Sequence, residues 1–514
     1  MPSARIAPLA ALMITALFSS GCGSADDPPR SADDIPAPEH VPMDIPGMLE
    51  SANQSDGASQ LLADAIRRID AEDPIYRAVL HLNPHAERLA AERDNLDPDA
   101  RGPLHGIPVL IKDNMETLDM PTTAGAHALA DLRTGRDAGV VARLRESGAI
   151  MLGKTNLSEW ANFRSERSSS GWSGLGGQTR NAVDFARSPC GSSSGSAVAV
   201  ALGYVPLALG TETNGSIICP AAINGVVGFK PTVGTLPADG IIPIAHTQDT
   251  AGPMARSVTD VALGFAIMAA LPPDAVIEAV RAGELRGRRI GIVRGASGYH
   301  QGVDALFDAA IDALREAGVE LVDDLEFERY DGFNSDTYAV LLHEFKHDLN
   351  AWLAGLPEPA RVTTLDELIA FNEARADETM PYFRQEIFIK AAATEGLDAA
   401  AYREALARIR AATREDGIDR LLAEHGLDAL IAPSVGPAWS IDLVNGDHYL
   451  GGFSTFPAVA GYPHITVPMG TVHGLPVGLS ITAGADGDIE VLALGHAFEQ
   501  LDARPDLGAP LPQD

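Results

Sequence analysis

The chain has 514 residues, of which 46% are hydrophobic, 50 are glycine and 35 are proline, a composition typical of a globular protein with many loops and turns. This length is enough for one large domain or for two to three smaller ones. The formal net charge of −32 argues against nucleic acid or an anionic membrane surface as a partner.

The N-terminus has the pattern of an export signal. Arg5 supplies a positive charge, residues 6–18 form an apolar run, and small residues precede Cys22. A cysteine directly after small residues indicates a bacterial lipoprotein signal over residues 1–22, in which Cys22 is lipidated and becomes the new N-terminus. Ser19 stands where leucine is usual, so plain secretion remains the alternative.

The segment after the signal differs in composition from the rest of the chain. Residues 23–46 are rich in Pro, Asp and Ala, which predicts a disordered linker ahead of a single domain over 47–505. No later apolar run reaches the length of a membrane span, so we expect membrane contact only through a lipid anchor at Cys22.

Hydrophobic periodicity predicts helices and strands along most of this domain. The predicted helices cover residues 61–70, 84–93, 138–148, 196–202, 305–317, 338–353, 399–424 and 490–501. The predicted strands cover residues 105–111, 149–152, 205–209, 225–230, 288–294, 430–432, 464–468 and 476–482. The alternation indicates an α/β fold in one large domain, with a helix-rich insertion at about 270–425. Residues 165–196 are dominated by Gly, Ser and Asn and predict a functional loop system.

The run Gly-Thr-Glu-Thr-Asn-Gly-Ser at 210–216 contains the candidate nucleophile. It consists of small, flexible residues and ends at Ser216. Such a loop can bring several backbone N–H groups to one point, which a developing oxyanion requires. A serine is a poor nucleophile, however, until a base takes its proton.

Two residues upstream are candidates for moving that proton. Lys112 follows an apolar run and is predicted to enter the core, where burial lowers the pKa of a lysine and allows it to act as a base. Ser192 lies in the run Cys-Gly-Ser-Ser-Ser-Gly-Ser and could relay the proton. Taken singly, the lysine could also mark the solvent end of a strand, and the serine run could be a flexible loop.

Together these motifs resemble the amidase signature family of serine hydrolases, and within it the peptide amidase-like branch. The separation of 24 residues between Ser192 and Ser216 is that of the family. Departures are Cys190 and Ser194, where glycine is usual, and Ala182, where proline often follows asparagine. Further blocks that resemble the family, within a resemblance covering roughly 50–505, lie at 177–181, 220–222, 225–232, 249–254 and 461–468.

The resemblance implies a role for each of these residues. Ser216 is the nucleophile, Ser192 is a bridging serine with a cis peptide bond, and Lys112 is the general base. The oxyanion is held by the backbone N–H groups of Thr213, Asn214, Gly215 and Ser216. The implied fold is a large mixed β-sheet flanked by helices. The implied reaction is hydrolysis of a carboxamide through an acyl-enzyme, without metal or cofactor. The substrates are C-terminal peptide amides that release ammonia, with other amides or esters as further candidates.

A zinc site is the strongest rival to this interpretation. Residues His343, Glu344 and His347 match the H-E-x-x-H motif in a segment predicted to be helical, and Glu373 is a candidate third ligand. This motif predicts a zinc metallopeptidase, but it explains nothing about residues 105–256.

Other interpretations depend on the serine run or on the cysteines. Residues 191–195 match the G-x-S-x-G pattern of α/β-hydrolases, but no strand pattern precedes them. Loss of one of the three residues Lys112, Ser192 and Ser216 would favour a non-catalytic lipoprotein that binds amidated peptides, but all three are present. Beyond Cys22 only Cys190 and Cys219 remain, and we expect small buried thiols there rather than a disulfide.

Overall fold

The computed structural model describes residues 44–501 and 504–508. The predicted signal over 1–22, Cys22 and most of the predicted linker over 23–46 lie outside the described residues. Helix α1 (Ile45–Ala52) already begins within the last two linker residues. Ile45 is fully buried, and its backbone N–H donates to Asp260 Oδ1 at 3.2 Å, so packing orders the chain slightly earlier than its composition indicates.

A 12-stranded mixed sheet forms the centre of the described chain, in the order β1-β3-β2-β6-β8-β7-β12-β13-β11-β9-β10, with β14 beside β12. Its strands are β1 (Val79–Leu82), β2 (Pro108–Lys112), β3 (Ile150–Thr155), β6 (Leu207–Glu212), β7 (Val227–Lys230), β8 (Thr250–Ala255), β9 (Arg289–Val293), β10 (Glu320–Leu325), β11 (Ala429–Pro433), β12 (His464–Val472), β13 (Leu475–Thr482) and β14 (Asp506–Leu507). Strands β3, β2 and β6 are parallel, and the central strands from β6 to β11 are antiparallel. A separate hairpin consists of β4 (Trp172–Ser173) and β5 (Gly177–Gln178).

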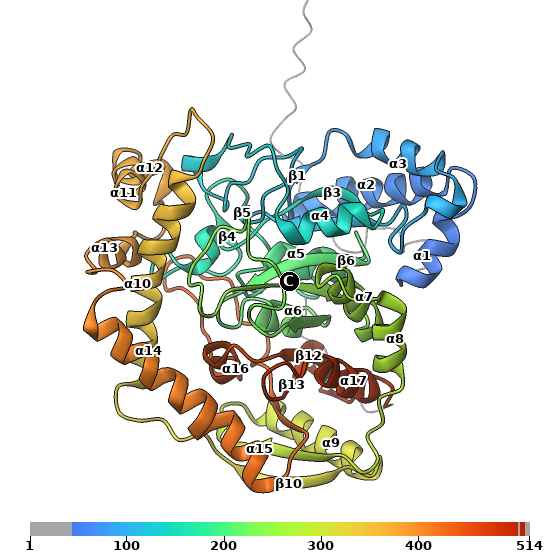
Figure 1. Ribbon diagram of the computed structural model, residues 1–514, viewed down its shortest axis with the longest axis vertical. Helices are drawn as coiled ribbons and strands as arrows, with labels where there is room; N and C mark the ends of the chain where they lie inside the picture. Colours follow the sequence, from blue (N-terminus) through green and yellow to red (C-terminus); the bar gives the residue numbers. More distant parts are fainter. Residues whose placement is uncertain (1–43, 502–503, 509–514) are drawn as a thin grey trace, which may run out of the picture. The chain divides into compact units, whose positions relative to one another are not determined.

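Helices cover both faces of the sheet (Figure 1). The remaining helices are α2 (Gly57–Tyr76), α3 (Ala86–Asp94), α4 (Gly139–Glu146), α5 (Ser194–Ala201), α6 (Ile218–Ile223), α7 (Val258–Met268), α8 (Pro273–Arg281), α9 (Gln301–Glu316), α10 (Phe333–Ala354), α11 (Leu365–Ala374), α12 (Ala376–Thr379), α13 (Glu386–Ala392), α14 (Ala400–Thr413), α15 (Asp419–His425), α16 (Thr455–Ala460) and α17 (Asp488–Glu499). Among the described residues, no helix is both long enough and apolar enough to cross a membrane.

Strand β2 shows why the sheet is covered on both sides. Val109 and Ile111 belong to the core cluster that includes α7, α9 and α17, whereas Leu110 between them belongs to the cluster that includes α2 and α5. Side chains of a strand alternate between its two faces, so a run that is apolar at every position must be buried on both.

The helix-rich segment at about 270–425 also contributes to the sheet. Strands β9 and β10 extend it in parallel beyond β11, and the helical part proper starts with α10. The helix predicted over 399–424 is divided between α14 and α15, because the backbone at Gly417 is not helical (φ −111°, ψ −107°).

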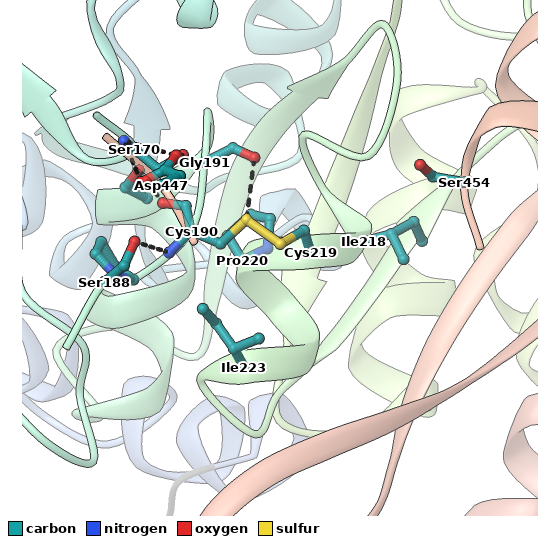
Figure 2. The surroundings of a disulfide bond; sticks show 12 residues. Ser170, Ser188, Cys190, Gly191, Ile218, Cys219, Pro220, Ile223, Asp447 and Ser454 are labelled. Atoms are coloured by element: carbon teal, nitrogen blue, oxygen red, sulfur yellow. Dashed lines mark hydrogen bonds between the residues drawn. A yellow bond between two sulfur atoms is a disulfide. The ribbon is translucent and has the colours of Figure 1, made fainter. Parts of the chain in front are cut away.

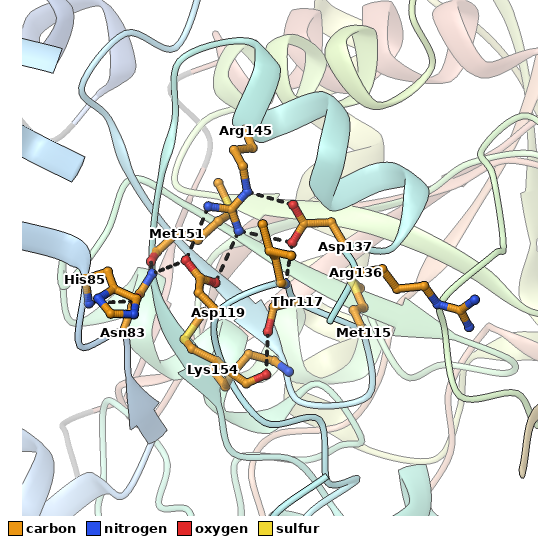
Figure 3. Close-up of polar contacts among 12 residues, drawn as sticks. Asn83, His85, Met115, Thr117, Asp119, Arg136, Asp137, Arg145, Met151 and Lys154 are labelled. Carbon is orange, nitrogen blue, oxygen red and sulfur yellow. Dashed lines mark hydrogen bonds and ion pairs between the residues drawn. The ribbon is translucent and has the colours of Figure 1, made fainter. Parts of the chain in front are cut away.

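An ion-pair network fixes the loop that follows β2 (Figure 3). The Arg145 guanidinium contacts Asp137 at 2.7 Å and Asp119 at 3.2 Å, and Asn83 Nδ2 donates to Asp119 at 2.7 Å. These groups are largely buried, so the pairs are less screened than surface pairs. They hold the chain just beyond the C-terminal end of β2, where Lys112 lies.

Candidate active site

The C-terminal ends of β2 and β6 bring the candidate base next to its partners. The two strands are parallel neighbours, so their ends meet at one edge of the sheet. Lys112 is the last residue of β2 and is fully buried. Its Nζ lies 2.7 Å from Ser192 Oγ, 2.7 Å from Thr211 Oγ1 and 3.2 Å from the Thr211 carbonyl oxygen.

Burial sets the protonation of Lys112. Loss of hydration lowers the pKa of its ammonium to about 7, although the negative charges of Asp249 and Glu212 oppose the shift. A neutral amine has two N–H donors and one lone pair. The two oxygens of Thr211 can accept the N–H groups, which leaves the lone pair for the hydroxyl of Ser192.

Two other buried lysines lack this arrangement. Lys154 Nζ lies 3.0 Å from Asp113 Oδ1, so its charge is paired. Lys230 donates to the Pro231 carbonyl oxygen at 3.1 Å, and no hydroxyl contact is found for its Nζ among the described residues. Of the three, only Lys112 reaches a serine hydroxyl in the part of the chain that the structure describes.

Ser192 is fully buried in the loop before α5, and the predicted cis peptide bond is present between Gly191 and Ser192. The next residue ties this loop to β6. Ser193 Oγ accepts from the Thr211 N–H at 3.2 Å and donates to the Thr211 carbonyl at 3.1 Å. The Ser193 N–H donates to the Ser216 carbonyl at 3.1 Å, which places the two predicted serine loops side by side.

The loop between β6 and α6 presents free backbone donors. The N–H groups of Ile217 and Ile218 donate to Glu212 Oε2 at 2.7 and 3.0 Å. Within the described chain, those of Asn214, Gly215 and Ser216 donate to no protein acceptor. Oriented N–H groups without a protein partner can bind a developing negative charge.

Buried carboxylates hold this loop in place. Glu212 accepts from the N–H groups at the end of the loop that leads into α6, and Asp249 accepts from Thr213 Oγ1 at 2.5 Å. Asp249 also accepts from the N–H groups of Ile244 and Ala245, and burial raises its pKa to about 6. The motifs do not reveal these roles of Glu212 and Asp249, although a lone carboxylate at the buried end of a strand is a usable signal in the sequence.

A cleft opens beside the two serine loops. Its lining includes Gly191 and Gly215 next to the two candidate serines, and its walls contain Ser170, Ser434, Trp439, Asp447, Tyr449 and Ser454. The Asp447 carboxylate accepts from the Ser170 hydroxyl at 2.6 Å and from Trp439 Nε1 at 3.0 Å, and Figure 2 shows Asp447 beside Ser170. The cleft therefore combines aromatic rings with polar groups next to the candidate nucleophile.

Cys190 and Cys219 form a disulfide in this cleft, with their Cα atoms 6.0 Å apart (Figure 2). The expectation of two free thiols is wrong. The cysteines are 29 residues apart in the sequence, and the fold brings the loop before α5 against the first turn of α6. The disulfide therefore links the loop of Ser192 directly to the helix that follows Ser216.

The H-E-x-x-H residues are used elsewhere. Glu344 is fully buried on α10, where its carboxylate accepts from Thr247 and Tyr402. His343 Nδ1 lies 2.9 Å from the Gly396 carbonyl, and His347 is exposed. In the described residues, the three-ligand group with metal-like spacing is Glu344 with His246 and Asp348, and it includes neither motif histidine.

This alternative group already has protein partners. The His246 backbone N–H and Nδ1 lie 3.0 and 2.8 Å from Asp348 Oδ2, so the group fastens residues 246–247 to α10. The zinc interpretation of His343, Glu344 and His347 thus has no support in the geometry. The G-x-S-x-G alternative also finds no preceding strand, because only an isolated bridge at Arg187 lies there among the described residues.

The sequence and the fold are similar to those of known proteins. The Amidase family model matches residues 60–492. A probable amidase of Arabidopsis thaliana is 37% identical over 468 residues, which cover 86% of each protein. The native peptide amidase from Stenotrophomonas maltophilia is 45% identical with a TM-score of 0.81, and the match covers 87% of this chain and 94% of that one.

A second structure, the peptide amidase PAM in complex with the competitive inhibitor chymostatin, is 44% identical with a TM-score of 0.84 and matches 89% of this chain and 96% of that one. These similarities confirm the predicted α/β fold with a large mixed sheet flanked by helices. The region matched by the family model contains Lys112, Ser192 and Ser216.

Proposed function

The chain belongs to the amidase family and hydrolyses amide C–N bonds, and from this premise we propose that it removes the C-terminal amide of peptides through an acyl-enzyme on Ser216. The observation that carries the proposal is the contact of 2.7 Å between Lys112 Nζ and Ser192 Oγ, next to a loop that ends in Ser216. The similarity to a peptide amidase supports the substrate class.

The reaction begins with attack on the amide carbonyl, which gives a tetrahedral intermediate. Ser216 Oγ attacks the amide carbonyl while its proton passes to Ser192, and the proton of Ser192 passes to neutral Lys112. The oxyanion accepts hydrogen bonds from the backbone N–H groups of Thr213, Asn214, Gly215 and Ser216, of which the last three donate to no protein acceptor within the described chain. Each donor of this kind contributes about 2.7–4 kcal/mol to transition-state stabilisation.

Collapse of this intermediate forms the acyl-enzyme and releases ammonia, and hydrolysis of the acyl-enzyme then releases the peptide. The C–N bond breaks as the proton on Lys112 returns through Ser192 to the leaving nitrogen, which departs as ammonia. Water then attacks the ester of Ser216, gives its proton to the same relay, and the peptide leaves with a free carboxyl group. The sum is one amide and one water converted into one acid and one ammonia, with no cofactor.

The substrate class is tested with matched peptides. We expect ammonia release from an acetylated dipeptide amide and no cleavage of the internal peptide bond in the same molecule. The methyl ester and an anilide of the same dipeptide measure the tolerance for other leaving groups. Cleavage of internal peptide bonds, or no ammonia from any peptide amide, would contradict the proposed substrate.

We also propose that the enzyme is exported and anchored by a lipid on Cys22. The signal pattern over 1–22 supports this, and so does the Cys190–Cys219 disulfide, because disulfides persist in oxidising compartments. In cells fractionated without detergent, we expect the wild type in the membrane pellet and Cys22→Ser in the soluble fraction. An unchanged distribution of the variant argues against lipidation.

A further inference from the structure

A chain of buried polar side chains runs across three neighbouring strands to the wall of the cleft. His464 and Thr466 lie two residues apart on β12, so both face the same side of the sheet. Ser480 on β13 pairs with Thr466, and Ser434 directly follows β11. All four side chains are nearly or completely buried, and Ser434 lines the cleft beside the serine loops.

Three short contacts connect these side chains. His464 Nε2 lies 2.6 Å from Ser480 Oγ, and Ser480 Oγ donates to Ser434 Oγ at 2.9 Å. Ser434 Oγ lies 2.7 Å from Thr466 Oγ1. Each hydroxyl has one proton to donate, and this determines the direction of the hydrogen bonds in this row of four side chains.

The histidine end fixes the first proton. Since Ser480 gives its proton to Ser434, the Nε2 of His464 must be the donor to Ser480. Burial and the charge of Lys230 lower the pKa of His464 far below its usual value, so the ring is neutral and Nδ1 has no proton. Consistent with this tautomer, Nδ1 contacts no hydrogen-bond partner among the described residues.

The threonine end fixes the second proton. Within the described part of the chain, the Thr466 hydroxyl has one hydrogen-bond partner, which is Ser434. A buried hydroxyl that donates nothing is costly, so Thr466 donates to Ser434. Ser434 Oγ then accepts two hydrogen bonds, and its own proton has no acceptor among the residues that the structure describes.

We propose that the Ser434 hydroxyl binds a backbone carbonyl of the peptide substrate, on the acyl side of the bond that is cleaved. This rests on the proposed function. Because its lone pairs are occupied by Ser480 and Thr466, the Ser434 hydroxyl must direct its proton away from both, and Ser434 lines the cleft. Ammonia, the leaving group, has no carbonyl, so an acceptor bound in this cleft belongs to the acyl part.

The surroundings of Ser434 favour a neutral acceptor. Asp447 contributes a carboxylate to the same cleft, which disfavours a negatively charged group there. The backbone of Ser434 is also fixed, because its N–H donates to the Gly478 carbonyl at 2.8 Å and its carbonyl accepts from the Phe453 N–H at 3.0 Å. The donor is therefore held ready before substrate arrives, which limits the entropy lost on binding.

The test compares two ligands that differ in backbone carbonyls. One is the acetylated dipeptide amide, and the other is hexanamide, a primary amide with no further carbonyl, measured as a competing ligand. For Ser434→Ala we expect the KM of the dipeptide amide to rise about 5–15-fold, as for loss of one neutral hydrogen bond, with kcat within about twofold. The inhibition constant of hexanamide should stay within about twofold.

Two further variants separate binding from structure. Ser434→Cys keeps a weak donor and should raise the KM of the dipeptide amide less than Ser434→Ala does. It also decides the question if Ser434→Ala does not fold. Thr482→Val is the matched control, since this buried hydroxyl on β13 donates to the Pro463 carbonyl at 2.7 Å and lies outside the cleft lining. Its KM for the dipeptide amide and its inhibition constant for hexanamide should both be unchanged.

The outcomes distinguish this proposal from the proposed function. If the wild type releases no ammonia from the dipeptide amide, the proposed function fails. If the wild type is active and Ser434→Ala leaves the KM of the dipeptide amide unchanged, the role of Ser434 is overturned. An equal rise for the dipeptide amide and for hexanamide overturns it as well, because a distorted cleft affects both ligands.

Discussion

Ser216→Ala is expected to lower kcat/KM for a peptide amide by about 10⁴-fold or more, with little change in KM, because the variant cannot form the acyl-enzyme. Water in place of the serine hydroxyl could still attack the substrate carbonyl, because the N–H groups of the loop between β6 and α6 remain intact. A small residual rate, rather than none, is therefore the expected result.

Ammonia release by purified wild type and variant, each with and without EDTA, measures this effect. Ser257→Ala is the matched control, because this serine caps the N-terminus of α7, where its Oγ accepts from the Asp260 N–H at 3.1 Å. It should lose about 1 kcal/mol of stability and keep its activity. If the Ser216→Ala variant still hydrolyses the amide and EDTA abolishes this activity, the serine mechanism is contradicted.

An acyl group on Ser216 can also be observed directly. Quenching the reaction early and mapping the peptide by mass spectrometry should locate the acyl group on Ser216 in the wild type. The Ser216→Ala protein should carry none. Acylation found on Ser193 would instead revive the G-x-S-x-G interpretation, although the Ser193 hydroxyl is already bonded to Thr211.

The sequence predicted the strands that bear the site because their patterns are local. Strand β2 is a continuous apolar run ending in Lys112, and β6 has a similar pattern. Strand β8 between β6 and β7 escaped prediction, since its sequence Thr-Ala-Gly-Pro-Met-Ala contains Gly252 and Pro253. Both residues weaken a strand pattern, and only the buried position between two strands explains the strand here.

The site was predictable where a motif carried it and hidden where the fold assembled it. The motifs identified Lys112, Ser192 and the loop of Ser216. The disulfide joins segments that are far apart in the sequence, and so do the hydrogen bonds between His464, Ser480 and Ser434. No local pattern reports such contacts, because they depend on the order of strands in the sheet.

Lys112→Ala should lower kcat by about 10²–10⁴-fold, the usual contribution of a general base. The pH dependence has a definite sign. The base must be neutral, and burial lowers the pKa of Lys112 to about 7, so kcat should rise as the pH rises through 7 and level off above it. Below pH 7 the protonated lysine cannot accept the proton of Ser192, and activity should fall about tenfold per pH unit.

The pH profile of Lys112→Ala shows which residue causes the fall in activity below pH 7. Two other groups near this site have shifted pKa values: burial raises the pKa of Asp249 to about 6, and the hydrogen bond to Asp348 raises the pKa of His246. If protonation of Lys112 causes this fall, the residual rate of Lys112→Ala is flat from pH 6 to 8. The surface control Lys390→Ala should keep the wild-type profile. If the fall in activity persists in Lys112→Ala, another group causes it, and the lysine is then not the base. Asp249, which accepts from Thr213 in the loop between β6 and α6, is then one candidate for the titrating group, and His246 is the other.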